Sequence, residues 1–102
     1  MHSKVIISWT LPDNGLRVEG PVVFNTTVTD IETLITPEEQ LHSELVDAIE
    51  NTSLAASLFD DWENGDWECE YTIDEHSGVE VVMIAISTGI VSIVLVPGVS
   101  IN

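Results

Sequence analysis

Carboxylates, which can take part in acid–base chemistry and in binding, dominate one stretch of this sequence. Within residues 60–75, eight of the sixteen residues are acidic: Asp60, Asp61, Glu63, Asp66, Glu68, Glu70, Asp74 and Glu75. Paired carboxylates can act as general acid and base, bind a cation, or attract a basic partner. Pairs recur along the whole chain, so a pair by itself does not choose between these roles.

Catalytic motifs are missing from the sequence. It contains no G-x-S-x-G elbow, no H-E-x-x-H helix and no Gly-rich phosphate loop. His2, His42 and His76 are scattered through the terminus, a helix and a loop, where we expect solvated side chains. The negative charge also disfavours phosphate binding. We therefore predict no catalytic residue, no cofactor and no enzymatic activity.

A metal site is suggested most strongly by residues 60–66, which resemble the start of a calcium loop. Counted from Asp60, positions 3 and 12 are Trp62 and Tyr71, so two of the required oxygen ligands are missing. Cys69 is the single cysteine, which excludes an intramolecular disulfide and a cysteine-based metal site. We predict an acidic helix end followed by a turn, and no metal.

The charge balance is the most unusual feature of the composition. Eighteen Asp and Glu residues face two cations, Lys4 and Arg17, and the net charge is −16. Such repulsion weakens a fold, so a basic partner or a high-salt habitat should offset it. The 44% hydrophobic content argues against disorder. The 102 residues correspond to one domain.

Strand patterns begin and end the chain. Residues 4–11 alternate apolar and polar side chains, residues 12–15 predict a turn, and residues 16–19 and 22–24 predict a returning strand. Gly20-Pro21 predicts a bulge or an edge in that strand. A further short strand is expected at residues 27–31.

The middle of the chain carries helical signals. Thr36, Pro37 and Glu39 form a capping-box pattern, and apolar residues follow at helical spacing to Ile49. Residues 51–53 predict a break and a second helix that ends at Asn64-Gly65. A single bent helix is the alternative.

Three strands are expected in the last third, at residues 67–73, 79–87 and 90–96. The last two are apolar at nearly every position, so we expect both of their faces to be covered. Helices would cover one face, and the N-terminal hairpin or a second subunit the other. The order β-β-(β)-α-α-β-β-β predicts an α+β domain, with a mainly antiparallel sheet of five to six strands packed against one or two helices.

A membrane span is the competing interpretation of residues 81–102, which carry no charge. Two turn signals, at residues 87–89 and at Pro97-Gly98, favour strands instead. The N-terminus shows no apolar signal-peptide core. We therefore expect no membrane contact and a cytoplasmic location, in the host cytoplasm if the protein is phage-encoded.

The predicted strand at residues 67–73 positions the acidic stretch. Alternation places Glu68, Glu70 and Asp74 on one face, with neighbours about 6.6 Å apart, similar to successive backbone phosphates. Trp62 lies beside them as a candidate interface anchor, whereas Trp67 and Cys69 are expected to pack inward. A second acidic face is expected on the first helix, formed by Glu38, Glu44, Asp47 and Glu50.

A protein that displays carboxylates in this way can occupy a groove built to bind phosphates. In size and charge pattern the chain resembles acidic phage DNA mimics, namely anti-CRISPR, anti-restriction and uracil-DNA glycosylase inhibitor proteins, and acidic immunity proteins against nuclease toxins. No motif of these families is matched. The leading hypothesis is an inhibitor of a nuclease or another nucleic-acid-binding enzyme, with a basic protein partner and no direct contact with nucleic acid.

Two further hypotheses come from other classes. In the first, the chain is a structural or assembly protein, for example a virion component that forms homodimers or larger oligomers through its apolar C-terminal strands. In the second, the acidity reflects adaptation to high salt, and the function is unrelated to it.

Overall fold

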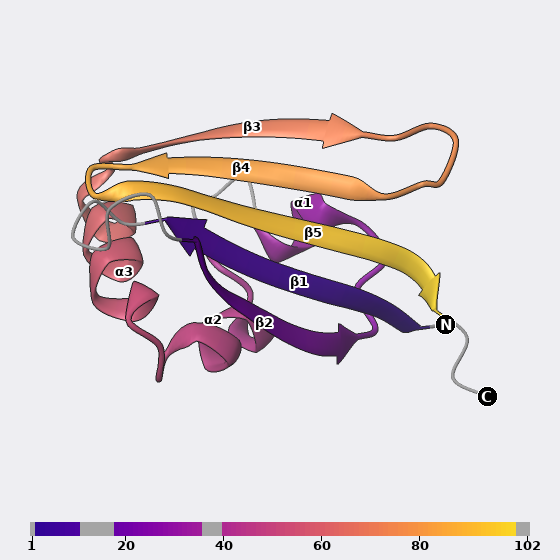
Figure 1. Ribbon diagram of the computed structural model, residues 1–102, viewed down its shortest axis with the longest axis horizontal. Helices are drawn as coiled ribbons and strands as arrows, with labels where there is room; N and C mark the ends of the chain where they lie inside the picture. Colours follow the sequence, from indigo (N-terminus) through magenta and orange to yellow (C-terminus); the bar gives the residue numbers. More distant parts are fainter. Residues whose placement is uncertain (1, 11–17, 36–39, 100–102) are drawn as a thin grey trace.

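A five-stranded antiparallel sheet organises the protein. The computed structural model describes residues 2–10, 18–35 and 40–99. Its sheet has the order β2-β1-β5-β4-β3, and all neighbouring strands run antiparallel (Figure 1). The strands are β1 (His2–Thr10), β2 (Val18–Thr26), β3 (Trp67–Ile73), β4 (Glu80–Ile86) and β5 (Gly89–Val99). The predicted α+β class is confirmed.

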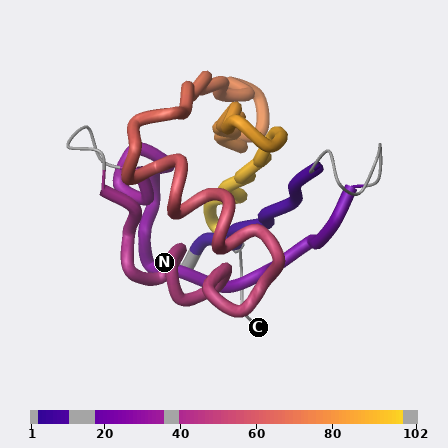
Figure 2. Tube along the Cα trace, turned by 90° about the vertical axis from the view of Figure 1, so that its left-hand side faces the viewer, coloured from indigo at the N-terminus to yellow at the C-terminus, as the bar shows by residue number. Residues whose placement is uncertain are grey.

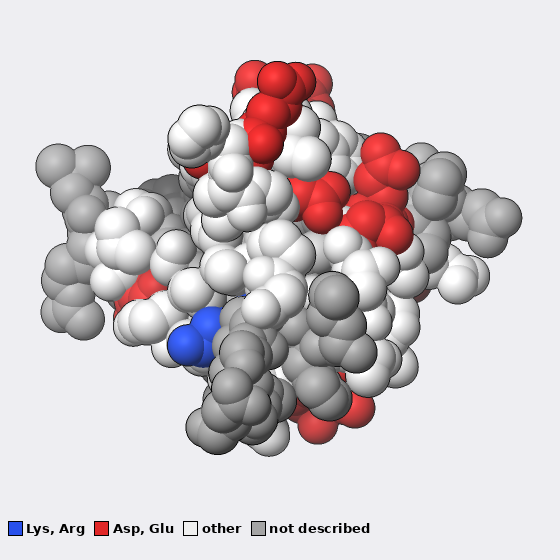
Figure 3. Space-filling model, turned by 90° about the vertical axis from the view of Figure 1, so that its right-hand side faces the viewer, with Lys and Arg blue, Asp and Glu red and all other residues white. Residues whose placement is uncertain are grey.

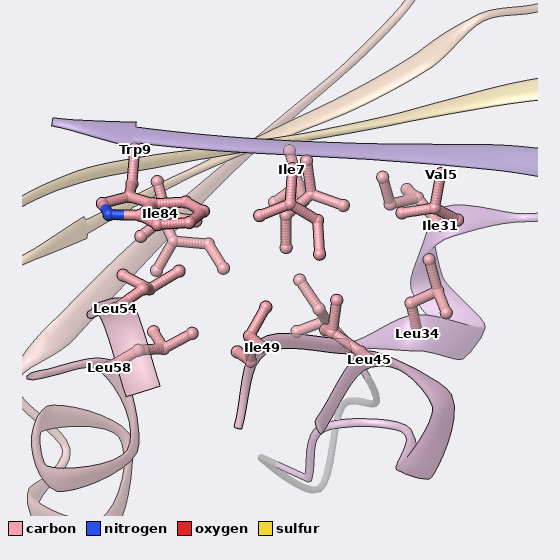
Figure 4. Close-up of a cluster of buried hydrophobic side chains, with 14 of the residues drawn as sticks. Val5, Ile7, Trp9, Ile31, Leu34, Leu45, Ile49, Leu54, Leu58 and Ile84 are labelled. Carbon is pink, nitrogen blue, oxygen red and sulfur yellow. The ribbon is translucent and has the colours of Figure 1, made fainter. Parts of the chain in front are cut away.

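Three short helices pack on one face of this sheet. They are α1 (Ile31–Leu34), α2 (Ser43–Ile49) and α3 (Leu54–Asn64). Figure 2 shows them together on one side of the strands. The core lies between the two layers, where Val5, Ile7 and Trp9 of β1 point toward a row of helix residues (Figure 4). That row consists of Ile31, Leu34, Leu45, Ile49, Leu54 and Leu58.

The expectation that the N-terminal hairpin covers the second face of β4 and β5 is wrong, and cover by a second subunit stays a prediction. The N-terminal hairpin does not lie over the sheet, because β1 pairs with β5 and extends it. The second face therefore remains open. Met83 is 40% exposed and Ile90 is 50% exposed there.

The starts of the helices differ from the sequence predictions. Asp30 caps α1 by accepting a hydrogen bond from the Thr33 backbone N–H at 3.0 Å, so a helical turn begins where a strand was expected. The capping-box residues Thr36, Pro37 and Glu39 lie outside the described residues. α2 begins only at Ser43, and His42 Nδ1 accepts from the Glu44 backbone N–H at 3.1 Å.

The end of α3 agrees with the prediction. Gly65 follows this helix with a φ of 76°, a left-handed conformation that favours glycine. The separation of α2 from α3 confirms two helices in place of one bent helix. Among the described residues, no helix has the length and apolarity needed to cross a membrane.

Gly20 and Pro21 disturb β2, as the sequence predicted. The register between β1 and β2 shifts between Ile7 and Trp9, opposite this dipeptide. Gly20 has a φ of 96°, and a Cβ atom there would lie 2.8 Å from the Ile7 carbonyl oxygen. β2 is thus an edge strand with a built-in irregularity, whereas β3, at the other edge, pairs with β4 without any shift.

Candidate functional site

Seven of the eight carboxylates within residues 60–75 are exposed, and they follow one continuous path. The path starts at the C-terminal end of α3, continues along the edge strand β3 and ends in the β3–β4 hairpin (Figure 1). Figure 3, viewed from the hairpin end, shows carboxylates gathered at the top of the molecule. We call this path the acidic band; its residues are Asp60, Glu63, Asp66, Glu68, Glu70, Asp74 and Glu75.

Glu68 and Glu70 form the centre of the band. They alternate along β3 with Trp67 and Cys69, which are half-buried and pack against the core. The two carboxylates therefore point to the open side of the sheet. Together with Met83, Ala85 and Ile90 they line a hollow of about 500 Å³. A row of negative charge thus borders an apolar depression.

Asp61 belongs to the fold and not to the displayed surface. Its side chain is only 6% exposed. The Oδ2 atom accepts hydrogen bonds from the Ser87 backbone N–H at 2.8 Å and from Ser87 Oγ at 2.7 Å. This carboxylate ties α3 to the β4–β5 turn, 26 residues away in sequence. Sequence reasoning grouped Asp61 with its neighbours because a local pattern does not reveal this partner.

Trp62 is likewise a packing residue. It is 8% exposed, and its ring stacks on Trp67 with centroids 3.8 Å apart and planes inclined by 9°. The stack joins α3 to the start of β3 and so holds the acidic ends of the two elements together. We therefore leave Trp62 out of the displayed surface. Trp67 packs inward, as expected.

Asp74 organises the hairpin that ends the band. β3 stops at Ile73, so Asp74 does not continue the alternation of Glu68 and Glu70. Its carboxylate accepts hydrogen bonds from the His76 backbone N–H at 3.0 Å and from Ser77 Oγ at 2.9 Å. These bonds lower the pKa of Asp74 below its ordinary value, and the bond from the His76 backbone has the largest effect. The carboxylate is exposed and stays charged.

The second acidic face is separate from the band. Asp47 is exposed on α2, Glu50 is exposed at the C-cap of this helix, Glu44 is half-buried, and Glu38 lies outside the described residues. α2 packs against β2, whereas the band follows β3 at the opposite edge of the sheet. The structure therefore does not merge the two groups into one surface.

Glu19 has a structural role that sequence reasoning missed. Its Oε2 atom accepts hydrogen bonds from Trp9 Nε1 at 3.0 Å and from Ser53 Oγ at 2.6 Å. It thereby joins β2 to β1 and to the start of α3. Its position in a strand gave no signal of this role, because the partners are 10 and 34 residues away.

Cys69, His42 and His76 are the thiol and the imidazoles whose surroundings the structure describes. Burial raises the pKa of the Cys69 thiol to about 11, so the thiol stays protonated at neutral pH. His42 is half-buried and caps α2, contrary to the expected solvated position, whereas His76 is exposed as expected. In the part of the chain that the structure describes, no three His, Cys, Asp or Glu side chains are placed to hold a metal ion together.

Comparisons of the chain with protein families, curated proteins and solved structures found no match. The functional inference therefore depends on the chain's own geometry and charge. The distinctive elements are the acidic band on an exposed edge strand and the open apolar face beside it.

Proposed function

We propose that this protein is an acidic inhibitor that binds a nuclease or another nucleic-acid-binding enzyme and blocks its phosphate-binding groove. The observation that carries the proposal is the exposure of seven carboxylates along one path, with Glu68 and Glu70 side by side on an edge strand. Residues two apart on a strand lie about 6.6 Å from each other. Lys and Arg side chains spaced for phosphates can meet carboxylates at that interval.

Electrostatics support binding to a basic protein. Lys4 is the single Lys or Arg among the described residues. It lies on β1, and β5 and β4 separate that strand from β3, so Lys4 does not neutralise the band. A strong negative field speeds the encounter with a positive groove and repels nucleic acid itself. We therefore propose a basic protein partner and no direct nucleic-acid contact, with action in the cytoplasm where such a target works.

The hollow beside the band adds a means of specificity. Met83, Ala85 and Ile90 offer an apolar floor next to the carboxylates of Glu68 and Glu70. An Arg or Lys of the partner can lay its aliphatic stem on this floor and direct its charge to the glutamates. Such a contact binds both the aliphatic stem and the charged group of a basic side chain, whereas a purely charged surface binds only the charged group.

The test begins with an affinity pulldown and mass spectrometry to nominate nucleic-acid-binding targets. Inhibition of each purified target is then titrated at about 50 mM and about 300 mM salt, since screening weakens exposed charge pairs. The decisive variant is Glu68→Lys/Glu70→Lys. Its matched control is Asp47→Lys/Glu50→Lys, which changes the net charge equally but at the C-terminal end of α2, where both residues are also exposed.

We expect the β3 variant to lose inhibition by at least about 100-fold, because two favourable contacts become repulsive. The α2 control should lose only the smaller effect of total charge, and higher salt should weaken the wild-type complex. Tight inhibition that ignores salt and survives both substitutions would eliminate carboxylate mimicry.

A further inference from the structure

The uncovered face of the sheet is unusual in its composition. It is formed by the even-numbered residues 4–10 of β1 and 90–96 of β5, and by the odd-numbered residues 81–85 of β4. We call it the open face. Its eleven positions on the three central strands include no Asp or Glu, although 18 of the 102 residues of the chain are acidic. Glu68 and Glu70 point to the same side of the sheet from the neighbouring edge strand β3. Apolar side chains dominate it, with Ile6 and Val94 paired at its middle.

Nothing in the described chain covers this face. All three helices lie on the other side of the sheet (Figure 2), and the N-terminal hairpin lies within the sheet plane. A contiguous apolar surface of this kind normally marks an interaction site. The exclusion of carboxylates from this one surface, in a chain with such an acidic excess, points in the same direction.

We propose that the open face packs against the same face of a second copy of this chain, forming a two-fold symmetric dimer. A basic partner would find carboxylates only along the β3 border of this face, at Glu68 and Glu70, and none over β1 and β5. A second copy presents an equally apolar and equally acid-free surface. Two sheets packed face to face at about 10 Å bury such side chains between them, and a two-fold axis makes one patch serve both sides.

The area of the sheet is sufficient for a weak dimer. The four strands β2, β1, β5 and β4 carry no carboxylate on this side. Spaced by about 4.8 Å and about eight residues long, they give a face of roughly 19 by 26 Å. Two such faces bury roughly 1,000 Å² in all, the size at which an interface is weak and transient. A dimer that forms only at high protein concentration is the corresponding expectation.

Charged residues occupy the margins of the contact. Lys4 lies in the row of the sheet beside Asn25 and Val96, near the chain ends, where its ammonium group can remain in water. Glu68 and Glu70 lie on β3 at the sheet edge. The dimer therefore buries no central charge. It covers Met83, Ala85 and Ile90, which also line the hollow beside Glu68 and Glu70, so a basic target that enters this hollow would compete with dimerisation.

The salt dependence of binding distinguishes the dimer from the proposed function. Each copy carries a net charge of −16, so association of two copies is opposed by repulsion and should tighten as salt is added. Binding of a basic target should weaken over the same range. One proposal can therefore fail while the other stands.

Sedimentation equilibrium over about 1 µM to about 1 mM protein tests the dimer, in a range chosen for a low-area interface. We expect a mass of twice 11.2 kDa at the upper concentrations. Ile90→Glu should raise the dimer Kd by at least about 100-fold, because it places a carboxylate of each copy in the contact. Ile73→Glu is the matched control: Ile73 is 60% exposed, Ile90 is 50% exposed, and Ile73 lies on the other side of the sheet.

A second measurement needs no variant. The melting temperature of a dimer rises with protein concentration, whereas that of a monomer does not. A monomeric mass at every concentration and a melting temperature independent of concentration would overturn the proposal and leave the face to a different protein. Equal weakening by Ile90→Glu and Ile73→Glu would overturn it as well, since the dimer would then use another surface.

Discussion

The buried carboxylate of Asp61 is expected to stabilise the fold, unlike the exposed carboxylates around it. One oxygen atom accepts two hydrogen bonds from Ser87, and this contact joins α3 to the β4–β5 turn. A hydrogen bond to a charged group contributes about 1.5–3 kcal/mol. Ser87 is exposed, so water partly replaces the lost contacts, and we expect Asp61→Ala to reduce the free energy of unfolding by about 2–3 kcal/mol.

Thermal unfolding followed by circular dichroism measures this effect. For a domain of this size, each kcal/mol lowers the melting temperature by about 4–8 °C, so a fall of about 10–20 °C is expected. Asp61→Asn keeps a neutral acceptor and should lose only about half as much. The matched control is Asp60→Ala, which removes the neighbouring exposed carboxylate and should leave the melting temperature unchanged or slightly raised, because repulsion is relieved.

A double-mutant cycle assigns the loss to the contact itself. Ser87→Ala removes the hydroxyl donor and leaves the backbone N–H, so it should cost about 1 kcal/mol. The coupling between Asp61→Ala and Ser87→Ala should be about 1 kcal/mol. If Asp61→Ala unfolds at the same temperature as Asp60→Ala, the carboxylate has no structural role and the reasoning is refuted.

Three other predictions concern single residues. Because burial raises the Cys69 pKa from 9.0 to about 11, its alkylation at pH 8 should be about 100-fold slower in the folded protein than in urea, and equal rates would contradict the burial. The lowered pKa of Asp74 means that its contribution to stability is present above its unfolded pKa and is lost as pH falls through the folded value. The difference in melting temperature between wild type and Asp74→Ala should therefore shrink on acidification from pH 6, and a constant or growing difference would show the opposite sign. Gly20→Ala should cost about 2–3 kcal/mol, measured by urea unfolding, because its Cβ would approach the Ile7 carbonyl oxygen at 2.8 Å in a left-handed backbone. Gly65→Ala, with a φ of 76° and no neighbouring atom within 4 Å, should cost only about 1 kcal/mol, and a similar cost for both would remove the close-approach argument.

Local pattern was sufficient for most elements of the fold. Alternation of apolar and polar residues identified β1 and β3, and Asn64-Gly65 marked the end of α3. These signals act over a few residues, since a strand repeats every two residues and a helix every 3.6. Where two local signals competed, the prediction failed: residues 27–31 have β-branched character, but Asp30 caps a helical turn there.

The candidate site was predictable only as far as such patterns reach. The run of acids placed Glu68 and Glu70 on one side of a strand, and the structure has them there. Which acids are displayed depends on partners distant in sequence. Asp61 is buried because Ser87 comes to it, and Glu19 is engaged by Trp9 and Ser53.

The sequence by itself determined the α+β class, the strand and helix periodicities and the density of carboxylates in residues 60–75. Only the tertiary structure decided where the N-terminal hairpin goes. Pairing of β1 with β5 adds the hairpin to the sheet edge-on, through backbone hydrogen bonds that every residue except proline can donate, so side-chain pattern does not specify it. That choice leaves an apolar face open beside the acidic band. The surface that we propose for a second copy therefore adjoins the one that we propose for a basic target, and the two share Met83, Ala85 and Ile90.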